Sequence, residues 1–472
     1  MLKRNKELAV NTIILGIGQL IPKFLTLIIL PILTTYLKEE EFGVYDLILS
    51  FANFLIPIVT LQIQQAVFRY ILTETEFKKK EEFVTTSFFY VLISSAAIMP
   101  IVYLILRFIG NDLLTALLIC VLFFSESLYN LLGQIVRGLG FNAKYSISVI
   151  AFSVANLLFT ALLVMVFQFG LNGVIVSITA AYVISDIFMV AASGMLKYIR
   201  IGSFKKSALK TLVAFSAPIV PSSIALWIVN LSDRLIIITF MPNGKAMNGI
   251  YAVSNKIPTL YSTAYSIFNL AWTETASRVS DDGDPAEYYS ELFHGLFNFL
   301  IGVMLFLIAF TPLLFQILVK GEFTDAINQV PILYAGAFFN SLVNFYSGIY
   351  IAFKRTKQVG ISSIVGAVIN IAINIILISQ IGLYAASIST AVSFMVIALC
   401  RAYDLNKVIK IQYDVKNIIV GIFVFFISGV MLMFNIWWLN IITILIAVIY
   451  NVVYNMNFFK KIINILKRKK AK

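Results

Sequence analysis

Two charged residues, Asp233 and Arg234, lie side by side within the apolar stretch ALWIVNLSDRLIIITFM at residues 225–241. An ionised side chain at mid-membrane depth costs several kcal/mol, so such residues usually face other protein groups or water. Neighbouring residues of a helix point about 100° apart, and the two charges therefore need separate environments. This predicts that Asp233 is buried against a neighbouring helix and that Arg234 faces a polar cavity, unless the pair only fixes helix packing. The residues that share a helical face with Arg234 would line that cavity: Asn230, Trp227 and Ser223.

A second cation, Lys256, lies at a similar depth in the next apolar stretch. It follows Gly249 by seven residues, and Arg234 precedes Met241 by seven. At roughly 1.5 Å per residue, both lie about 10 Å inside the outer ends of their helices. We therefore expect Asp233 to pair with Lys256, unless the lysine snorkels to the surface. Polar residues further along this helix are predicted to line the cavity or to hydrogen-bond a neighbouring helix: Thr259, Asn269 and Trp272.

Two further cations belong to earlier apolar stretches. Lys23 follows Pro22 near the middle of the first stretch, and Arg69 ends the second, where an ordinary interfacial position is the alternative. Together with Arg234 and Lys256, they fall on the first, second, seventh and eighth expected helices. A cavity lined by arginine and lysine is suited to an anionic ligand.

Three acidic residues lie within apolar stretches elsewhere. Asp46 and Glu126 are candidates for proton or ion binding or for charge pairing, and Asp186 is a candidate for pairing within its own bundle. The sequence has no G-x-x-x-x-G-K-[ST] loop for ATP, no acid pair in an accessible loop and no cysteine–histidine cluster for a metal. We therefore expect a protein that is not an enzyme and has no cofactor or metal, with Na⁺ or H⁺ coupling left open.

The composition places these residues in a membrane protein. Of the 472 residues, 60% are hydrophobic and only 12% are charged, whereas soluble domains average about 25% charged residues. A spanning helix needs about 20 mostly apolar residues. This length indicates an all-α polytopic membrane protein with about fourteen spans, near residues 10–36, 43–70, 83–108, 113–137, 145–168, 172–196, 212–240, 249–272, 292–319, 327–353, 360–380, 383–403, 415–435 and 437–458.

The distribution of lysine and arginine predicts the orientation of the chain. The basic clusters lie on the side of the N-terminus, at 78–80, 197–210, 354–357, 407–416 and the tail KRKKAK. The opposite side carries few basic residues, so the positive-inside rule predicts that both termini are cytoplasmic. The same rule accounts for the net charge of +13 better than nucleic-acid binding does.

A weak internal repeat organises the expected helices. FGVYDL at 42–47 recurs as NGIYAV at 248–253, and QFGLNG at 168–173 recurs as QIGLYA at 380–385. The offsets of 206 and 212 residues predict two six-helix copies in the same orientation. The expected domains are an N-lobe at 1–196, a basic cytoplasmic linker at 197–211, a C-lobe at 212–410, and an extra helix pair with a basic tail at 411–472.

Several stretches resemble the bacterial polysaccharide transporters, the flippases of O-antigen and capsule repeat units within the MOP superfamily, which includes MATE exporters and lipid II flippases. GIGQLIPKFLTLIILPILTTYLKEEEFGVYDL resembles the family's first helix pair. APIVPSSIALWIVNLSDRLII, followed by GIYAVSNKIP, looks like its seventh and eighth helices, and FKRTK followed by INIAINIILISQIGLYAASIST is similar to its later half. The resemblance implies two six-helix lobes, alternating access and a cationic cavity, with Lys23, Arg69, Arg234 and Lys256 as the candidate cations.

The resemblance also implies a function. Such a flippase moves undecaprenyl-diphosphate-linked oligosaccharide units from the inner to the outer leaflet of the bacterial cytoplasmic membrane. Its expected partners are this lipid-linked oligosaccharide, the bilayer and polysaccharide polymerase machinery, and no nucleic acid. Two alternatives stay open. One is a lipid II-type flippase, and the other is a MATE-type ion-coupled drug exporter, which the acids Asp46 and Glu126 would support. Short external loops disfavour a membrane enzyme such as a polymerase or glycosyltransferase.

Overall fold

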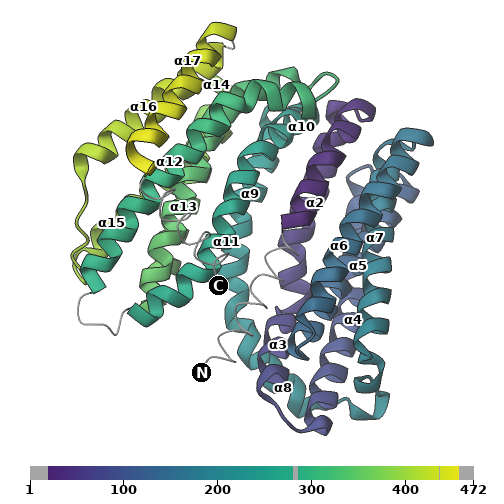
Figure 1. The fold of residues 1–472 in the computed structure, drawn as a ribbon. Helices are drawn as coiled ribbons and strands as arrows, with labels where there is room; N and C mark the ends of the chain where they lie inside the picture. The colour runs from purple at the N-terminus through teal and green to yellow at the C-terminus, as the bar shows by residue number, and fades with distance from the viewer. Residues whose placement is uncertain (1–19, 280–284, 354, 435, 457–472) are drawn as a thin grey trace, which may run out of the picture. The chain divides into compact units, whose positions relative to one another are not determined.

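The computed structural model describes residues 20–279, 285–353, 355–434 and 436–456 (Figure 1). All regular secondary structure in these ranges is helical, which confirms the predicted all-α class. The chain divides into two compact units, Met1–Leu235 and Ile236–Lys472. This division differs from the predicted lobe boundary at residues 197–211, because α8 and the first part of α9 belong to the first unit. The lobes that the sequence repeat suggests stay a prediction.

The first unit begins with a described helix at Leu20–Tyr36. The elements that follow are α2 (Glu39–Thr60), α3 (Ile63–Thr73), α4 (Phe77–Phe108), α5 (Leu113–Gly138), α6 (Asn142–Thr160), a π-helix (Ala161–Val166), α7 (Gly170–Ser193), two 3₁₀ turns (Met195–Tyr198 and Ile201–Ser203), α8 (Lys206–Ser216), a 3₁₀ turn (Ala217–Ile219) and α9 (Val220–Phe240). Helix α5 packs against α3, α4 and α7, and α6 packs against α7 (Figure 1).

Two of the predicted spans in this unit are interrupted. The second span breaks between α2 and α3, where Leu61 and Gln62 have φ angles of 46° and 56°. This left-handed conformation is unfavourable for residues with a side chain, so neighbouring groups must hold it in place. The seventh span breaks at the 3₁₀ turn that contains Pro218, because proline lacks the N–H that a helix interior requires.

The basic segment after α7 folds onto α4. Thr85 of α4 donates to the carbonyl of Tyr198 at 2.7 Å and accepts from the backbone N–H of Arg200 at 3.1 Å. Glu81 is 7% exposed and accepts a hydrogen bond from the hydroxyl of Ser203. Its Oε2 lies 3.8 Å from Nε of Arg200. The segment that the sequence predicts as a linker is therefore anchored to the first unit by hydrogen bonds.

The second unit contains α10 (Gly244–Ser254), α11 (Lys256–Val279), α12 (Pro285–Leu318), a 3₁₀ helix (Phe323–Gln329), α13 (Val330–Ala352), α14 (Thr356–Ile381), α15 (Leu383–Leu405), α16 (Val415–Phe434), α17 (Trp437–Tyr450) and a π-helix (Asn451–Asn455). Helix α13 packs against α11 and α15, α14 packs against α15, and α16 and α17 pack on α12. The break between α10 and α11 lies at Asn255, three residues before Pro258, which cannot donate a helical hydrogen bond.

The C-terminal helix pair is fixed to α12 by side-chain amides. Asn451 donates to the carbonyl of Gly302 at 3.1 Å, and Asn455 donates to the carbonyl of Asn298 at 3.0 Å. The two amides approach α12 so closely that a Cβ on Gly302 would collide with both of them. The pair is therefore an integral part of the second unit.

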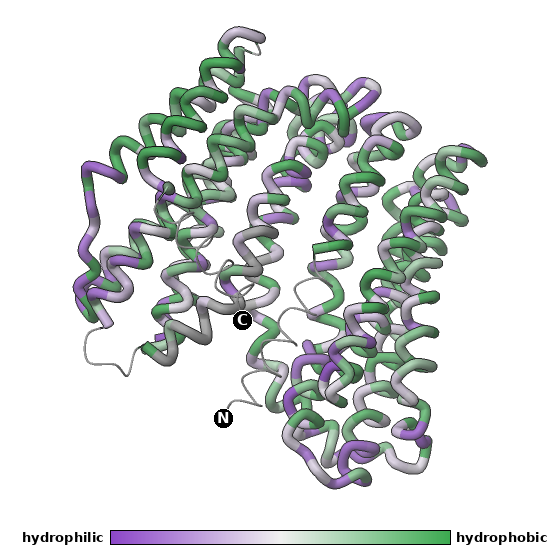
Figure 2. Tube along the Cα trace, viewed as in Figure 1, coloured by the Kyte–Doolittle hydropathy of each residue, from purple (hydrophilic) through white to green (hydrophobic). Residues whose placement is uncertain are grey.

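Ten of the described helices are long and apolar enough to span a membrane, which confirms a multi-pass membrane protein (Figure 2). Four predicted spans are not among these ten, and they coincide with the helix Leu20–Tyr36, α9, α11 and α13. Helices α9 and α11 carry most of the predicted cavity residues.

Candidate functional site

Arg234 of α9 forms an ion pair with Asp46 of α2. The arginine Nε lies 2.8 Å from Asp46 Oδ2, and the two side chains are only 13% and 10% exposed. The guanidinium also donates through Nη1 to the backbone carbonyl of Asn230 at 2.8 Å. The sequence therefore correctly places Arg234 and Asn230 on one helical face, and Asp46 acts as the charge partner of Arg234.

The pair lies inside both helices, away from their ends. Asp46 follows the start of α2 at Glu39 by seven residues, and Arg234 precedes the end of α9 at Phe240 by six. A rise of roughly 1.5 Å per residue puts each about 10 Å from its helix end. In the predicted orientation these ends are the external ones.

A second polar contact joins the same two segments of the chain. Gln62, at the left-handed break after α2, donates to the hydroxyl of Ser223 on α9 at 3.1 Å. Gln64 donates to Gln62 at 2.9 Å, and both glutamines are buried. Ser223 therefore has a polar partner at the break after α2, whereas its predicted place in a polar row with Arg234 stays a prediction.

Asp233 is 2% exposed, which agrees with its predicted burial. Its predicted partner, Lys256, is half-buried at the first position of α11. The two residues belong to different units, so their pairing stays a prediction.

The remaining candidates have different surroundings. Lys23 on the first helix and Arg69 on α3 are exposed, whereas Trp227 and Asn269 are half-buried. Thr259 is exposed and donates to the carbonyl of Asn255 at 2.6 Å. Their roles in binding stay predictions.

Trp272 packs in the interior of the second unit. Its side chain is 2% exposed, its Nε1 donates to the carbonyl of Phe345 at 2.9 Å, and the two rings are stacked with centroids 4.7 Å apart. Gly348 provides the space for the indole. We assign Trp272 a structural role between α11 and α13.

Glu126 of α5 is 8% exposed and faces Tyr182 of α7. Tyr129, one turn later on α5, lies close to both Glu126 and Asp186 of α7. Glu126 and Asp186, the two acids that the sequence singles out on these helices, therefore lie near the same tyrosines inside the first unit. Asp46 instead pairs with Arg234.

Arg401 is a buried cation that sequence reasoning missed. It is 2% exposed on α15, and its guanidinium donates to five neutral acceptors on α13 and α14: the carbonyls of Val343 and Val359 and the hydroxyls of Ser347, Ser362 and Ser363. Its place near the basic end of an apolar helix resembles an ordinary interfacial arginine. Only the packing of three helices reveals that it is enclosed.

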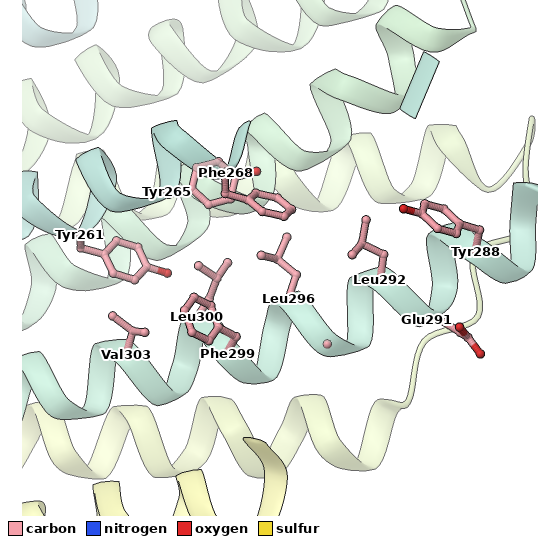
Figure 3. Close-up of a pocket in the computed structure, with 11 residues that line it drawn as sticks. Tyr261, Tyr265, Phe268, Tyr288, Glu291, Leu292, Leu296, Phe299, Leu300 and Val303 are labelled. Carbon is pink, nitrogen blue, oxygen red and sulfur yellow. The ribbon is translucent and has the colours of Figure 1, made fainter. Parts of the chain in front are cut away.

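An apolar groove of about 430 Å³ runs between α11 and α12 in the second unit (Figure 3). Tyr261, Tyr265 and Phe268 form one wall, and Leu292, Leu296 and Leu300 lie on the other. The groove is lined chiefly by aromatic and aliphatic side chains. Among the described lining residues, Glu291 at one end carries the charged side chain.

The long apolar helices define a polytopic membrane protein. Solved structures share the fold: the lipid II flippase MurJ in an inward closed conformation aligns over 96% of this chain and 100% of its own, with a TM-score of 0.72 at 15% identity. An inward-facing multidrug resistance MATE family transporter aligns over 82% of this chain and 96% of its own, with a TM-score of 0.63 at 16% identity. MATE in complex with MaL6 aligns over 82% and 92%, with a TM-score of 0.61 at 15% identity. The fold is that of the MOP superfamily.

The family model described as "Polysaccharide biosynthesis protein" matches residues 8–280, more than half of the chain. The chain therefore belongs to this family. A search of curated protein sequences finds no significant match.

Proposed function

We propose that the protein is a flippase that moves undecaprenyl-diphosphate-linked oligosaccharide units from the inner to the outer leaflet of the bacterial cytoplasmic membrane by alternating access. Family membership and the MOP fold support a transporter of lipid-linked molecules. The observation that carries the finer proposal is Arg234, an arginine enclosed in membrane helices with one carboxylate, Asp46, as its ion-pair partner.

Arginine suits a phosphate ligand because its planar guanidinium can form two parallel hydrogen bonds to phosphate oxygens. In the described arrangement Asp46 supplies the negative charge that the guanidinium needs at this depth. A substrate diphosphate would replace Asp46 as the partner of Arg234. This exchange would keep the arginine compensated while releasing α2 from α9, and so would link substrate binding to movement of the two helices.

A MATE-type drug exporter is the second candidate, and the structural similarity to MATE transporters favours it. A cationic drug that binds at the position of Arg234 would require an acid there that is not already paired. Asp46 does not provide one in this structure because Arg234 occupies it. The diphosphate substrate is therefore the better match to this pair.

The test is a flipping assay with purified protein in liposomes. A fluorescent undecaprenyl-diphosphate saccharide is reconstituted, and the fraction that reaches the opposite leaflet is measured over time. The account expects flipping by the wild-type protein, at least a tenfold lower rate in Arg234→Gln, and an unchanged rate in Arg107→Gln, whose arginine is exposed at the end of α4. Export of cationic dyes without flipping of the lipid would instead favour the drug exporter.

A further inference from the structure

The basic segment after α7, defined here as residues 194–210, carries positive charge without a matching number of acids. Between Asp186 and Asp233 the sequence contains no acidic residue. The same stretch has five cations with exposed side chains: Lys197, Arg200, Lys205, Lys206 and Lys210. Arg200 lies 3.8 Å from Glu81 of α4, whereas the four lysines take part in none of the ion pairs among the described residues.

Two large apolar side chains are exposed among these cations. Leu196 is 67% exposed and Ile201 is 83% exposed. Tyr198, which lies between them in the sequence, instead packs its ring against that of Phe77 on α4, with the centroids 4.8 Å apart. Exposed apolar residues next to lysines are typical of segments that lie in a membrane interface, where apolar side chains enter the acyl region and ammonium groups stay among the headgroups.

Hydrogen bonds to α4 hold the basic segment in a fixed conformation. The backbone N–H of Lys205 donates to the hydroxyl of Thr86 at 3.2 Å. The hydroxyl of Thr85 bonds the backbone at Tyr198 and Arg200, and both threonines are fully buried. The exposed lysines and apolar side chains therefore belong to an ordered surface of the first unit.

The attachment to α4 also sets the depth of the basic segment in the membrane. Helix α4 has 32 residues and is about 48 Å long, whereas the hydrocarbon core of a bilayer is about 30 Å thick. The charged run KKKEE at 78–82 lies at the start of α4, so the excess length is at this end. Thr85 follows Phe77 by eight residues, or about 12 Å, which places the basic segment beside the part of α4 that crosses the headgroups.

We propose that the basic segment binds anionic phospholipids of the adjacent leaflet. The four lysines contact lipid phosphates, and Leu196 and Ile201 enter the upper acyl region. Only a lipid with net negative charge compensates the lysines, because a zwitterionic headgroup brings its own cation. The positive-inside rule accounts for lysines at this end of the helices, but it does not account for the two exposed apolar side chains or for the fixed backbone. The proposal does not depend on which molecule the protein transports.

Native mass spectrometry of the purified protein tests the lipid preference. The protein is released from micelles that contain equal amounts of phosphatidylglycerol and phosphatidylcholine with the same acyl chains. We expect the wild type to retain phosphatidylglycerol in severalfold excess and a fourfold glutamine variant of the basic segment to lose most of this excess. That variant combines Lys197→Gln, Lys205→Gln, Lys206→Gln and Lys210→Gln.

A matched control removes the same charge from exposed lysines of the second unit. It combines Lys357→Gln, Lys407→Gln, Lys410→Gln and Lys416→Gln. We expect this control to keep the preference for phosphatidylglycerol. Equal losses in the two variants would show that the lysines act only through net charge, and would overturn the proposal, as would a wild type without preference.

Spin-label accessibility tests the position of Ile201 in bilayers that contain phosphatidylglycerol. A nitroxide is attached at Ile201→Cys or, as a reference, at Thr75→Cys, an exposed position just before α4. Both variants carry Cys400→Ser, because Cys400 is exposed whereas Cys120 is buried. We expect the label at 201 to be relaxed more by oxygen, which concentrates in the membrane, than by a water-soluble nickel chelate, and the label at 75 to show the reverse. A water-like pattern at 201 overturns the proposal and leaves the apolar side chains as a contact for a soluble partner.

Discussion

Arg234 of α9 and Asp46 of α2 lie 2.8 Å apart and compensate each other's charge within the membrane helices. The ion pair joins α2 and α9 about 10 Å from the ends of these two helices. Gln62 and Ser223 join the same segments through a hydrogen bond of 3.1 Å.

The pair should contribute to stability as a unit. Replacing one member removes the ion pair between two mostly buried charges, so Arg234→Gln and Asp46→Asn should each lower the free energy of unfolding by roughly 3 kcal/mol. The double variant should lose less than the sum of the two, because the ion pair can be lost only once. Unfolding of the purified protein measured for all four members of the cycle would show this coupling. Simple additivity would mean that the two side chains do not interact in solution.

The C-terminal helix pair should depend on the small size of Gly302. A methyl group at this position would displace the amides of Asn451 and Asn455, and Gly302→Ala should destabilise the protein by roughly 1–3 kcal/mol. Gly295 lies on the same helix with open space around its Cβ position, so Gly295→Ala serves as the matched control. Thermal unfolding in detergent should separate the two variants; equal melting temperatures would contradict the close contact.

Arg401 should be indispensable for the packing of α13, α14 and α15. Its removal in Arg401→Leu leaves buried carbonyl and hydroxyl groups without a donor, and a loss of about 3 kcal/mol or more is expected. Arg401→Lys should rescue little because an ammonium cannot reach acceptors on two helices in the same geometry. Lys407→Gln, an exposed position near the end of the same helix, is the control. Full stability of Arg401→Leu would show that the network is not required.

Asp112 provides a pH-dependent contribution outside the membrane segments. Its carboxylate accepts from the backbone N–H of Thr115 at 3.0 Å and caps α5, and the hydrogen bonds from Thr115 lower the pKa of Asp112. Because the pKa of Asp112 is lower in the folded state, its contribution to the free energy of unfolding is complete above the usual pKa of aspartate. That contribution is lost as the pH falls through the lowered pKa. The stability difference between wild type and Asp112→Ala should therefore be constant near neutral pH and shrink in acid. A difference that grows in acid would contradict the cap.

Helical periodicity predicts neighbours along one helix but not partners on another. It correctly predicts the burial of Asp233, whereas the polar row of Arg234, Asn230 and Ser223 stays a prediction. Asp46, the ion-pair partner of Arg234, is 188 residues away in the sequence, and only the folded structure brings the two side chains together. The break at Leu61 and Gln62 contains neither glycine nor proline, so no local residue type indicates it. Arg401 escapes prediction because its acceptors are ordinary serines and backbone carbonyls on two other helices.

The exchange of partners at Arg234 predicts two opposite effects on ligand binding. Arg234→Gln removes the phosphate-binding group. Asp46→Asn instead removes the carboxylate that competes with the ligand phosphate for Arg234. The ligand then no longer has to break the ion pair, and each 1.4 kcal/mol saved in this way raises the affinity about tenfold.

The most direct measurement is the affinity of the purified protein for a short-chain polyprenyl diphosphate, compared between wild type, Arg234→Gln, Asp46→Asn and the exposed control Arg107→Gln. The account predicts at least tenfold weaker binding by Arg234→Gln, severalfold tighter binding by Asp46→Asn, and no change in the control. Wild-type affinity in Arg234→Gln would contradict the central claim that this arginine binds the substrate diphosphate.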